Sequence, residues 1–371
     1  MRRPTADRAT VVVKIGSSSL TRGRPGLDAD ALRSVVSQVV ALRDRGHPVV
    51  LVTSAAVAAG LPALGVDVRP TDVPGLQAAA AVGQSRLMQA YTQAFDSHGV
   101  TVGQVLLTRN VLADRDQYLH ARQAFERLLS LDVVPIVNEN DTVAIEELRL
   151  GDNDRLAAMV GHLVGAGLLL LLTDTSGVFS ADPRSDESAT LLSAVEHTDA
   201  VLDGLVSGRS GPLGSGGIST KIAAARMAAW SGIPTVIAPA DAPDVASLAA
   251  GGQDIGTWIE PRSQRLPARK LWIAFGQPSE GRIIVDAGAR TAITRGGSSL
   301  LPVGVTAVEG EFGAGAAAEV AGPDGHLVAK GVSRFDATEL RRRAGHRSEH
   351  GEVAIHRDDM IVLAPLGEPR S

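Results

Sequence analysis

Short apolar runs alternate with amphipathic segments over residues 10–260. The runs end at Gly, Pro or polar residues, as buried strands do; they are Val11–Ile15, Pro48–Thr53, Thr101–Leu107, Val133–Val137, Leu168–Thr173 and Pro234–Ala238. Between them, apolar positions recur at helical spacing in Asp28–Arg45, Gly75–Phe95, Asp116–Leu129, Asp152–Val164 and Thr220–Ala229. Strands that are apolar along their whole length need cover on both faces. The pattern predicts a three-layer αβα sandwich with a mainly parallel sheet.

The pattern changes near residue 260. The polar, Pro-containing segment Glu260–Ala268 is typical of a linker, so we expect one domain over residues 1–262 and a second over 263–371. Beyond the linker, short β-type runs are separated by Gly-rich turns; they are Trp272–Phe275, Ile283–Val285, Thr306–Val308 and Ala318–Val320. This spacing predicts a small β-rich domain.

Composition excludes several function classes. The 371 residues include no cysteine, which removes disulfides, thiolate nucleophiles and iron–sulfur clusters. A net charge of −5 and an aromatic share of 3% disfavour a general polyanion binder. The longest apolar stretch, Val164–Leu172, is far shorter than the roughly 20 residues that span a bilayer. We expect a cytoplasmic protein with no membrane partner, and the histidine spacing predicts no metal site on the protein itself.

Polar or Gly-rich residues stand where the predicted strands end. Parallel strands bring their carboxyl ends to one edge of a sheet, where ligands bind. The strand-end segments are Lys14–Ser19, Thr53–Gly60, Asn138–Asp141 and Thr173–Asp174, and a fifth polar segment, Gly214–Lys221, leads into a predicted helix. The sequence therefore predicts one shared site at this edge.

The Gly214–Lys221 segment has the composition of a phosphate-binding loop. Its glycines allow backbone N–H groups to approach an anion, and the following helix adds a favourable dipole. Ser219 or Thr220 is expected to cap that helix. Lys221 stands where the dipole disfavours a cation, which points to an anionic ligand. The alternative is a flexible turn before a capped helix, and Gly-rich motifs alone do not decide between the two.

Lysine is rare in this chain, since only four of the 36 basic residues are Lys: Lys14, Lys221, Lys270 and Lys330. A retained lysine hints at a place where a compact ammonium meets a phosphate, although this observation taken alone is better explained by chance survival of four lysines.

Amides and carboxylates gather after the fourth predicted strand and before a predicted helix. The groups are Asn138, Asn140 and Asp141, and then Gly151–Asp154. The purely structural interpretation is that Asp152 or Asn153 caps the helix and that Asp154 is a favourable acid in its first turn. The surplus of such groups suits recognition of a zwitterionic amino acid. Ser17–Ser19 and Ser54, read singly, are best interpreted as helix caps, and Asp174 is either a turn residue or a nucleotide contact.

Taken together, these motifs resemble those of the glutamate 5-kinases in the amino acid kinase family. The resemblance runs from about Thr10 to Met360 and rests on ordered segments that also include 80–86 (Ala-Ala-Val-Gly-Gln-Ser-Arg), 103–109 (Gly-Gln-Val-Leu-Leu-Thr-Arg), 137–141, 151–154 and 181–184. The C-terminal part resembles a PUA domain through segments 295–302, 331–334 and 356–360.

The resemblance implies ATP-dependent phosphorylation of the γ-carboxylate of L-glutamate, the first step of proline biosynthesis. It implies Lys14, Asp154 and Lys221 as catalytic residues, and Ser54, Asp141 and Asn153 as glutamate ligands. ATP with Mg²⁺ would be held by Lys14, Thr173, Asp174, Ser215, Gly216, Gly217, Ile218, Ser219, Thr220 and Lys221. It further implies a homo-oligomer, dimer or tetramer, that proline inhibits. The family usually has Gly at position 55, so we expect Ala55 to crowd the substrate or to require a backbone shift.

Two alternatives remain open. A related kinase would act on aspartate, acetylglutamate or a nucleoside monophosphate. An RNA-binding or RNA-modifying protein would use the PUA-like domain, although the balanced charge of residues 268–371 disfavours it.

Overall fold

The computed structural model describes residues 2–108, 111, 114–143, 153–183, 186–196, 217–262, 266–277, 279–347 and 351–363. The chain forms two compact units, Met1–Arg265 and Leu266–Ser371. Within the described residues, no helix combines the length and the apolar character that crossing a bilayer requires.

The first unit is built on an eight-stranded sheet in the order β3-β4-β2-β1-β5-β7-β8-β6. Neighbouring strands pair in parallel, except that β8 runs antiparallel to β7. The strands are β1 (Val11–Ile15), β2 (Val49–Val52), β3 (Val102–Leu107), β4 (Val134–Glu139), β5 (Leu168–Thr173), β6 (Ala194–Glu196), β7 (Thr235–Pro239) and β8 (Thr257–Glu260). All six predicted strands are confirmed, and the short strands β6 and β8 were not predicted.

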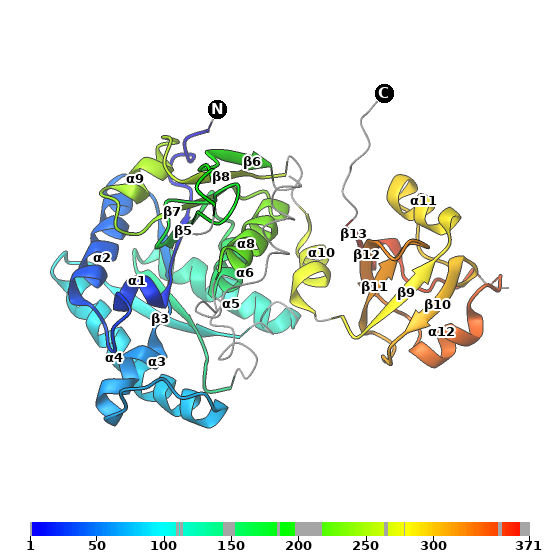
Figure 1. The fold of residues 1–371 in the computed structure, drawn as a ribbon, viewed down its shortest axis with the longest axis horizontal. Coiled ribbons are helices and arrows are strands. Elements are labelled where there is room, and N and C mark those ends of the chain that lie inside the picture. The colour runs from blue at the N-terminus through cyan, green and yellow to red at the C-terminus, as the bar shows by residue number, and fades with distance from the viewer. Residues whose placement is uncertain are drawn as a thin grey trace. The chain divides into compact units, whose positions relative to one another are not determined.

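Helices cover both faces of this sheet, as the apolar strands predicted (Figure 1). One layer, which shares a hydrophobic core with Val11 and Val13, holds α2 (Ala29–Asp44), α3 (Ala56–Gly60), α4 (Val73–Asp96) and α9 (Val245–Ala250). The opposite layer holds α5 (Arg115–Ser130), α6 (Asn153–Val164) and α8 (Ile218–Trp230), and the short helix α1 (Ser17–Thr21) follows β1. The three-layer αβα sandwich is confirmed.

The pleat of β1 decides where its one charged residue points. All five residues of β1 are buried. Successive side chains of a strand face opposite sides of the sheet, so Lys14 shares a face with Val12, opposite Val11 and Val13. Since Val11 and Val13 pack against the α2 layer, Lys14 faces the α6 layer.

Strand β1 also lies where the strand order reverses. From β1 the sheet extends through β2, β4 and β3 on one side and through β5, β7, β8 and β6 on the other. Ligands of open parallel sheets bind beyond the carboxyl ends of the strands at such a point. Lys14 is the penultimate residue of β1, Ser54 follows the end of β2 by two residues, and Thr173 ends β5, so the topology brings the three to one edge.

The second unit holds a five-stranded sheet in the order β10-β9-β11-β12-β13, antiparallel except for the parallel pair β9–β11. The elements are β9 (Gly281–Val285), β10 (Val305–Glu309), β11 (Ala317–Ala321), β12 (Leu327–Val332), β13 (Met360–Val362), α10 (Ala268–Leu271), α11 (Ala287–Gly296) and α12 (Ala337–Arg343). Single turns of 3-10 helix cover Pro302–Gly304 and Arg357–Asp359 in this unit and Leu61–Leu64 in the first unit. The β-rich C-terminal domain is confirmed.

The predicted strand Trp272–Phe275 is wrong, because Trp272–Gly276 forms a π-helical turn that continues α10. A four-residue apolar run that ends at a glycine is compatible with strand or helix, since periodicity does not separate them at that length. Ile273 is fully buried, and the ammonium of Lys330 donates to the carbonyl oxygens of Ala274 and Gln277. Tertiary contacts therefore hold the segment helical.

Helices α3 and α4 touch backbone to backbone. A Cβ atom added to Gly83 would lie 1.7 Å from the carbonyl oxygen of Ala56 and 2.5 Å from the nitrogen of Gly60. A Cβ atom at Gly60 would lie 2.0 Å from the carbonyl oxygen of Ala79. The two glycines set the distance between α4 and the helix that follows β2.

Replacing Gly83 with Ala is expected to push α3 away and to lower the free energy of unfolding by about 1–3 kcal/mol. Gly161→Ala in α6 is the matched control, because its added Cβ would meet Ile233 at an ordinary 3.5 Å. The control should leave stability unchanged or raise it by up to about 1 kcal/mol through helix propensity. Urea denaturation measures both, and equal stability of the Gly83→Ala variant and the wild type would contradict the close contact.

Candidate active site

A buried carboxylate holds two ammonium groups. Asp154, in the first turn of α6, has no exposed surface, and its two oxygens bind Lys14 from β1 and Lys221 from α8. The Lys221 Nζ atom lies 3.0 Å from Oδ2, and Lys14 forms a close ion pair with Oδ1. The hydroxyl of Thr220 also donates to Oδ2, at 2.9 Å. The three residues with catalytic roles in the resemblance thus meet at one point.

The charges of this cluster do not cancel. Burial alone raises the pKa of Asp154, but the positive charges and hydrogen bonds of Lys14 and Lys221 outweigh burial, so the pKa lies below its ordinary value. Asp154 is therefore ionised at neutral pH. One negative and two positive charges leave a net positive cluster, which favours an anionic ligand beside it.

The start of α8 differs from the predicted capping. The helix begins at Ile218 after Gly217, and no side chain caps it. The predicted caps Ser219 and Thr220 are wrong, because both residues lie within the first turn; the Thr220 hydroxyl instead donates to Asp154 and to the Gly217 carbonyl oxygen. Ser215 and Gly216 lie outside the described residues.

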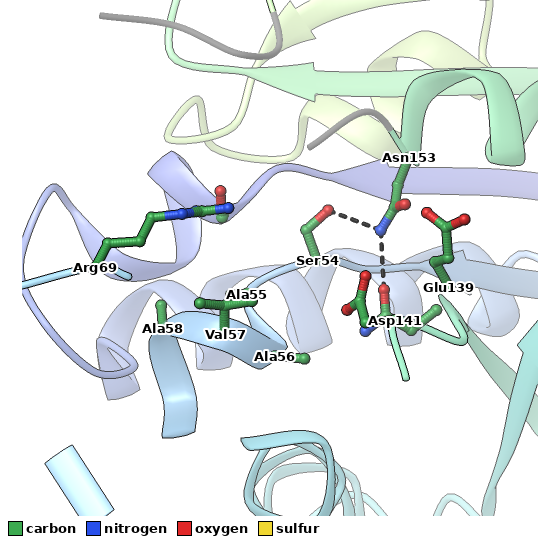
Figure 2. Close-up of a pocket in the computed structure, with 11 residues that line it drawn as sticks. Ser54, Ala55, Ala56, Val57, Ala58, Arg69, Glu139, Asp141 and Asn153 are labelled. Atoms are coloured by element: carbon green, nitrogen blue, oxygen red, sulfur yellow. Dashed lines mark hydrogen bonds between the residues drawn. The ribbon is translucent and has the colours of Figure 1, made fainter. Parts of the chain in front are cut away.

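A second polar cluster adjoins the first, because its central residue, Asn153, directly precedes Asp154 in the sequence. The Asn153 Nδ2 atom lies within hydrogen-bonding distance of three oxygens: Thr53 O at 2.6 Å, Asn138 Oδ1 at 2.8 Å and Ser54 Oγ at 3.0 Å. Figure 2 shows the contact with Ser54. Asn153, Asn138 and Ser54 are all buried. Neither Ser54 nor Ser17 caps a helix, since α1 and α3 begin after Gly16 and Ala55 without a side-chain cap.

A pocket opens beside this cluster at the carboxyl ends of β2 and β4. Figure 2 shows Ser54 and Asn153 on its wall with Asp141 and Glu139, and Arg69 reaching in from the other side. The remaining lining residues are Ser17, Ala55, Ala56, Val57, Ala58 and Asn138. Burial raises the pKa of Asp141 to about 6, and the positive charge of Arg69 acts in the opposite direction. The pocket therefore offers acceptors for an ammonium group and donors for a carboxylate.

Ala55 takes a left-handed conformation, with φ +79° and ψ 12°. An L-residue with a side chain pays about 1–2 kcal/mol for this region, which glycine occupies freely. The chain therefore carries at Ala55 the strain of a conformation that favours glycine. Ala55 lines the pocket, and crowding of the substrate by its methyl group stays a prediction.

Thr173 and Asp174 stand at the end of β5, beside β1. The Thr173 hydroxyl donates to the Asp174 carboxylate at 3.1 Å, and Ile15 pairs with Leu172 across the two strands. Asp174 is exposed, so it is accessible to a ligand at the sheet edge. Sequence reasoning missed Arg69, because it lies in a short segment without periodicity, whereas the pocket wall formed by α3 belongs to the predicted segment Thr53–Gly60.

The comparisons identify two families along the chain. The amino acid kinase family matches residues 9–239, and the PUA domain matches residues 281–352. The glutamate 5-kinase of Pelobacter propionicus is 43% identical over 362 residues, which cover 95% of this chain and 97% of that protein. The glutamate 5-kinase of Burkholderia multivorans is 44% identical over 374 residues, or 98% of this chain and 100% of that protein.

Among solved structures, the UMP kinase from Bacillus anthracis matches with a TM-score of 0.48 and 14% identity, covering 70% of this chain and 100% of that chain.

A third relative by sequence, the glutamate 5-kinase of Geobacter sulfurreducens, is 44% identical over 95% of this chain and 97% of that protein. The family model spans more than half of the chain, and these relatives match it over nearly its whole length. The chain belongs to the amino acid kinase family and carries a C-terminal PUA domain.

Proposed function

We propose that the chain catalyses ATP-dependent phosphorylation of the γ-carboxylate of L-glutamate to L-glutamyl 5-phosphate, the first step of proline biosynthesis. The observation that carries the proposal is the buried Asp154 carboxylate, which holds Lys14 and Lys221 next to a pocket with acceptors and donors for an amino acid. The names of the relatives support the choice of glutamate. Residues 1–262 would form the catalytic domain.

The amino acid would occupy the pocket beside Asn153. Ser54, Asp141 and Asn153 line that pocket, and these are the groups that suit a zwitterion. The Asp141 carboxylate and the Asn153 Oδ1 atom would accept from the substrate ammonium, and the Ser54 hydroxyl would donate to a carboxylate. The γ-carboxylate would then point toward the lysines, because Asn153 and Asp154 are consecutive.

ATP would lie on the other side of the lysines. Lys14, Thr173, Asp174 and Gly217–Lys221 would hold it, together with Ser215 and Gly216. The donor set fits a Mg²⁺ ion that arrives with the nucleotide: the Asp154 oxygens are engaged by lysines, whereas Asp174 offers an accessible carboxylate near the phosphates. When bound, the ion would shield phosphate charge.

The reaction needs charge neutralisation and no general base. A γ-carboxyl group has a pKa of about 4.3 and is ionised at neutral pH. One of its oxygens forms a bond to the γ-phosphorus while the bond from that phosphorus to the β–γ bridging oxygen breaks, and ADP leaves. An ammonium group carries three N–H donors, so a lysine that donates to Asp154 can also donate to a phosphoryl oxygen. Such positioning and neutralisation dominate phosphoryl transfer.

Assays of ADP release separate this proposal from its alternatives. Glutamate, aspartate, acetylglutamate and nucleoside monophosphates form the panel, and hydroxylamine trapping detects the acyl phosphate. Preference for glutamate as the acceptor supports the proposal. Preference for another acceptor would show instead that the chain is a related kinase with that substrate. Salt-sensitive, tight tRNA binding without kinase activity would favour the RNA-binding alternative. From the resemblance we also propose a cytoplasmic homo-oligomer that proline inhibits, and assays with added proline test the inhibition.

Replacing either catalytic lysine with Ala should lower kcat by about 10²–10³, because each removes one charge that faces the transferring group. Lys270→Ala, in α10 of the second unit, is the matched control and should keep the wild-type kcat. Steady-state kinetics at saturating substrates measure all three variants. Near-normal turnover of the Lys221→Ala variant would overturn the catalytic assignment.

The raised pKa of Asp141 predicts a pH dependence. Because this pKa is about 6 in the free protein, Asp141 is protonated below pH 6 and cannot then offer a full charge to the substrate ammonium. kcat/KM for glutamate should therefore rise as pH increases through 6 and level off above 7, since kcat/KM reports groups of the free enzyme. Asp141→Asn should lower kcat/KM about tenfold or more at pH 7.5 and flatten this rise. An unchanged profile in the variant would rule out Asp141 as the titrating group.

A further inference from the structure

The motifs at 80–86 and 103–109 have no role in the proposed reaction, yet each supplies one glutamine to a chain of amides. Gln84 lies on α4, and Gln104 lies on β3. The Gln84 amide donates to Gln104 Oε1 at 3.1 Å, and Gln84 Oε1 accepts from Asn138 Nδ2 at 2.8 Å. Asn138 Oδ1 in turn accepts from Asn153 at 2.8 Å, and Asn153 reaches Ser54 in the pocket.

The inner members of this series of hydrogen-bonded amides are buried. Asn138 is 2% exposed and Asn153 is 6% exposed, whereas Gln84 is half-buried and Gln104 is exposed. Buried amides need protein partners, because water has little access to them. The chain thus runs from the surface on β3 to the wall of the pocket.

The orientation of Asn138 depends on Gln84. An amide has a donating end and an accepting end, and Asn138 uses the first on Gln84 and the second on Asn153. If Asn138 turned over, its NH₂ group would face the NH₂ group of Asn153, where two donors repel each other. The acceptor of Gln84 is the contact that holds Asn138 in the orientation that Asn153 requires.

We propose that Gln84 is a positioning residue for the amino-acid pocket: through Asn138 it fixes the direction in which Asn153 presents its amide beside Ser54. Gln84 does not line the pocket, so it acts only through the other two amides. The inference rests on the proposed function, because that function puts glutamate against Ser54 and Asn153.

Two substitutions at position 84 separate the acceptor from the shape of the side chain. Gln84→Met keeps the length and removes the acceptor, which frees Asn138 to turn. Gln84→Glu keeps the acceptor, and Gln104 can turn its own exposed amide to donate to the new carboxylate. Ser85→Ala is the matched control, since Ser85 is exposed on the same helix and its hydroxyl donates to the Val82 carbonyl oxygen within α4.

Kinetics of the full-length protein provide the test. Gln84→Met should raise KM for glutamate about tenfold, the cost of one lost buried hydrogen bond, while kcat and KM for ATP stay within about twofold of wild type. Gln84→Glu should restore KM for glutamate to within about threefold, and Ser85→Ala should match the wild type. Thermal melting is measured alongside. Unchanged KM in Gln84→Met would overturn the inference, and so would an equal rise of KM in both position-84 variants.

A wild type that does not phosphorylate glutamate would remove the proposed function without deciding the role of Gln84. Hydrogen exchange of the Asn153 side-chain amide, followed by NMR, then decides it without turnover. The exchange should be about tenfold faster in Gln84→Met than in wild type and unchanged in Gln84→Glu, because the Asn153 amide loses Asn138 Oδ1 as an ordered acceptor only in the first. Equal rates in the wild type and both variants would overturn the inference.

Discussion

A single buried carboxylate, shared by two ammonium groups, is the interaction on which the site depends. Burying any of these charges alone is too costly, so Asp154, Lys14 and Lys221 are tolerated only together. Removing the Asp154 carboxylate would lower the free energy of unfolding by about 3–5 kcal/mol, because two uncompensated ammonium groups would then remain in the interior. The need to pair these charges therefore ties β1, α6 and α8 to one geometry, and leaves a net positive charge at the edge of the sheet.

The neighbouring pocket is coupled to this cluster by one peptide bond. Asp154 binds the lysines, and Asn153, the residue before it, binds Ser54 and Asn138. A rotation of the first turn of α6 would disturb both sets of contacts at once. In the proposed reaction, this helix terminus would place the acceptor carboxylate and the two ammonium groups within the same small region. The glycine contact between α4 and α3 fixes the position of α3, which lines the pocket.

Much of this architecture is predictable from the sequence, because buried parallel strands are apolar along their whole length and polar residues mark their ends. The family resemblance supplied roles for Lys14 and Lys221 that spacing alone does not. Other features depend on three-dimensional contacts that no local pattern contains. The helical turn at Trp272–Gly276 is stabilised by Lys330, which lies far along the chain. The Thr220 hydroxyl donates to Asp154 instead of capping its helix. Ala55 adopts a left-handed conformation that its local propensity disfavours. The roles of individual site residues stay predictions.

The most direct test is a crystal structure of the protein with ADP, Mg²⁺, glutamate and a planar phosphoryl mimic such as tetrafluoroaluminate. We expect the Nζ atoms of Lys14 and Lys221 to lie about 3 Å from the equatorial atoms of the mimic while Asp154 still holds both, because charge-assisted contacts of ammonium groups have that length. A mimic bound away from Asp154, or either lysine turned away from it, would contradict the account.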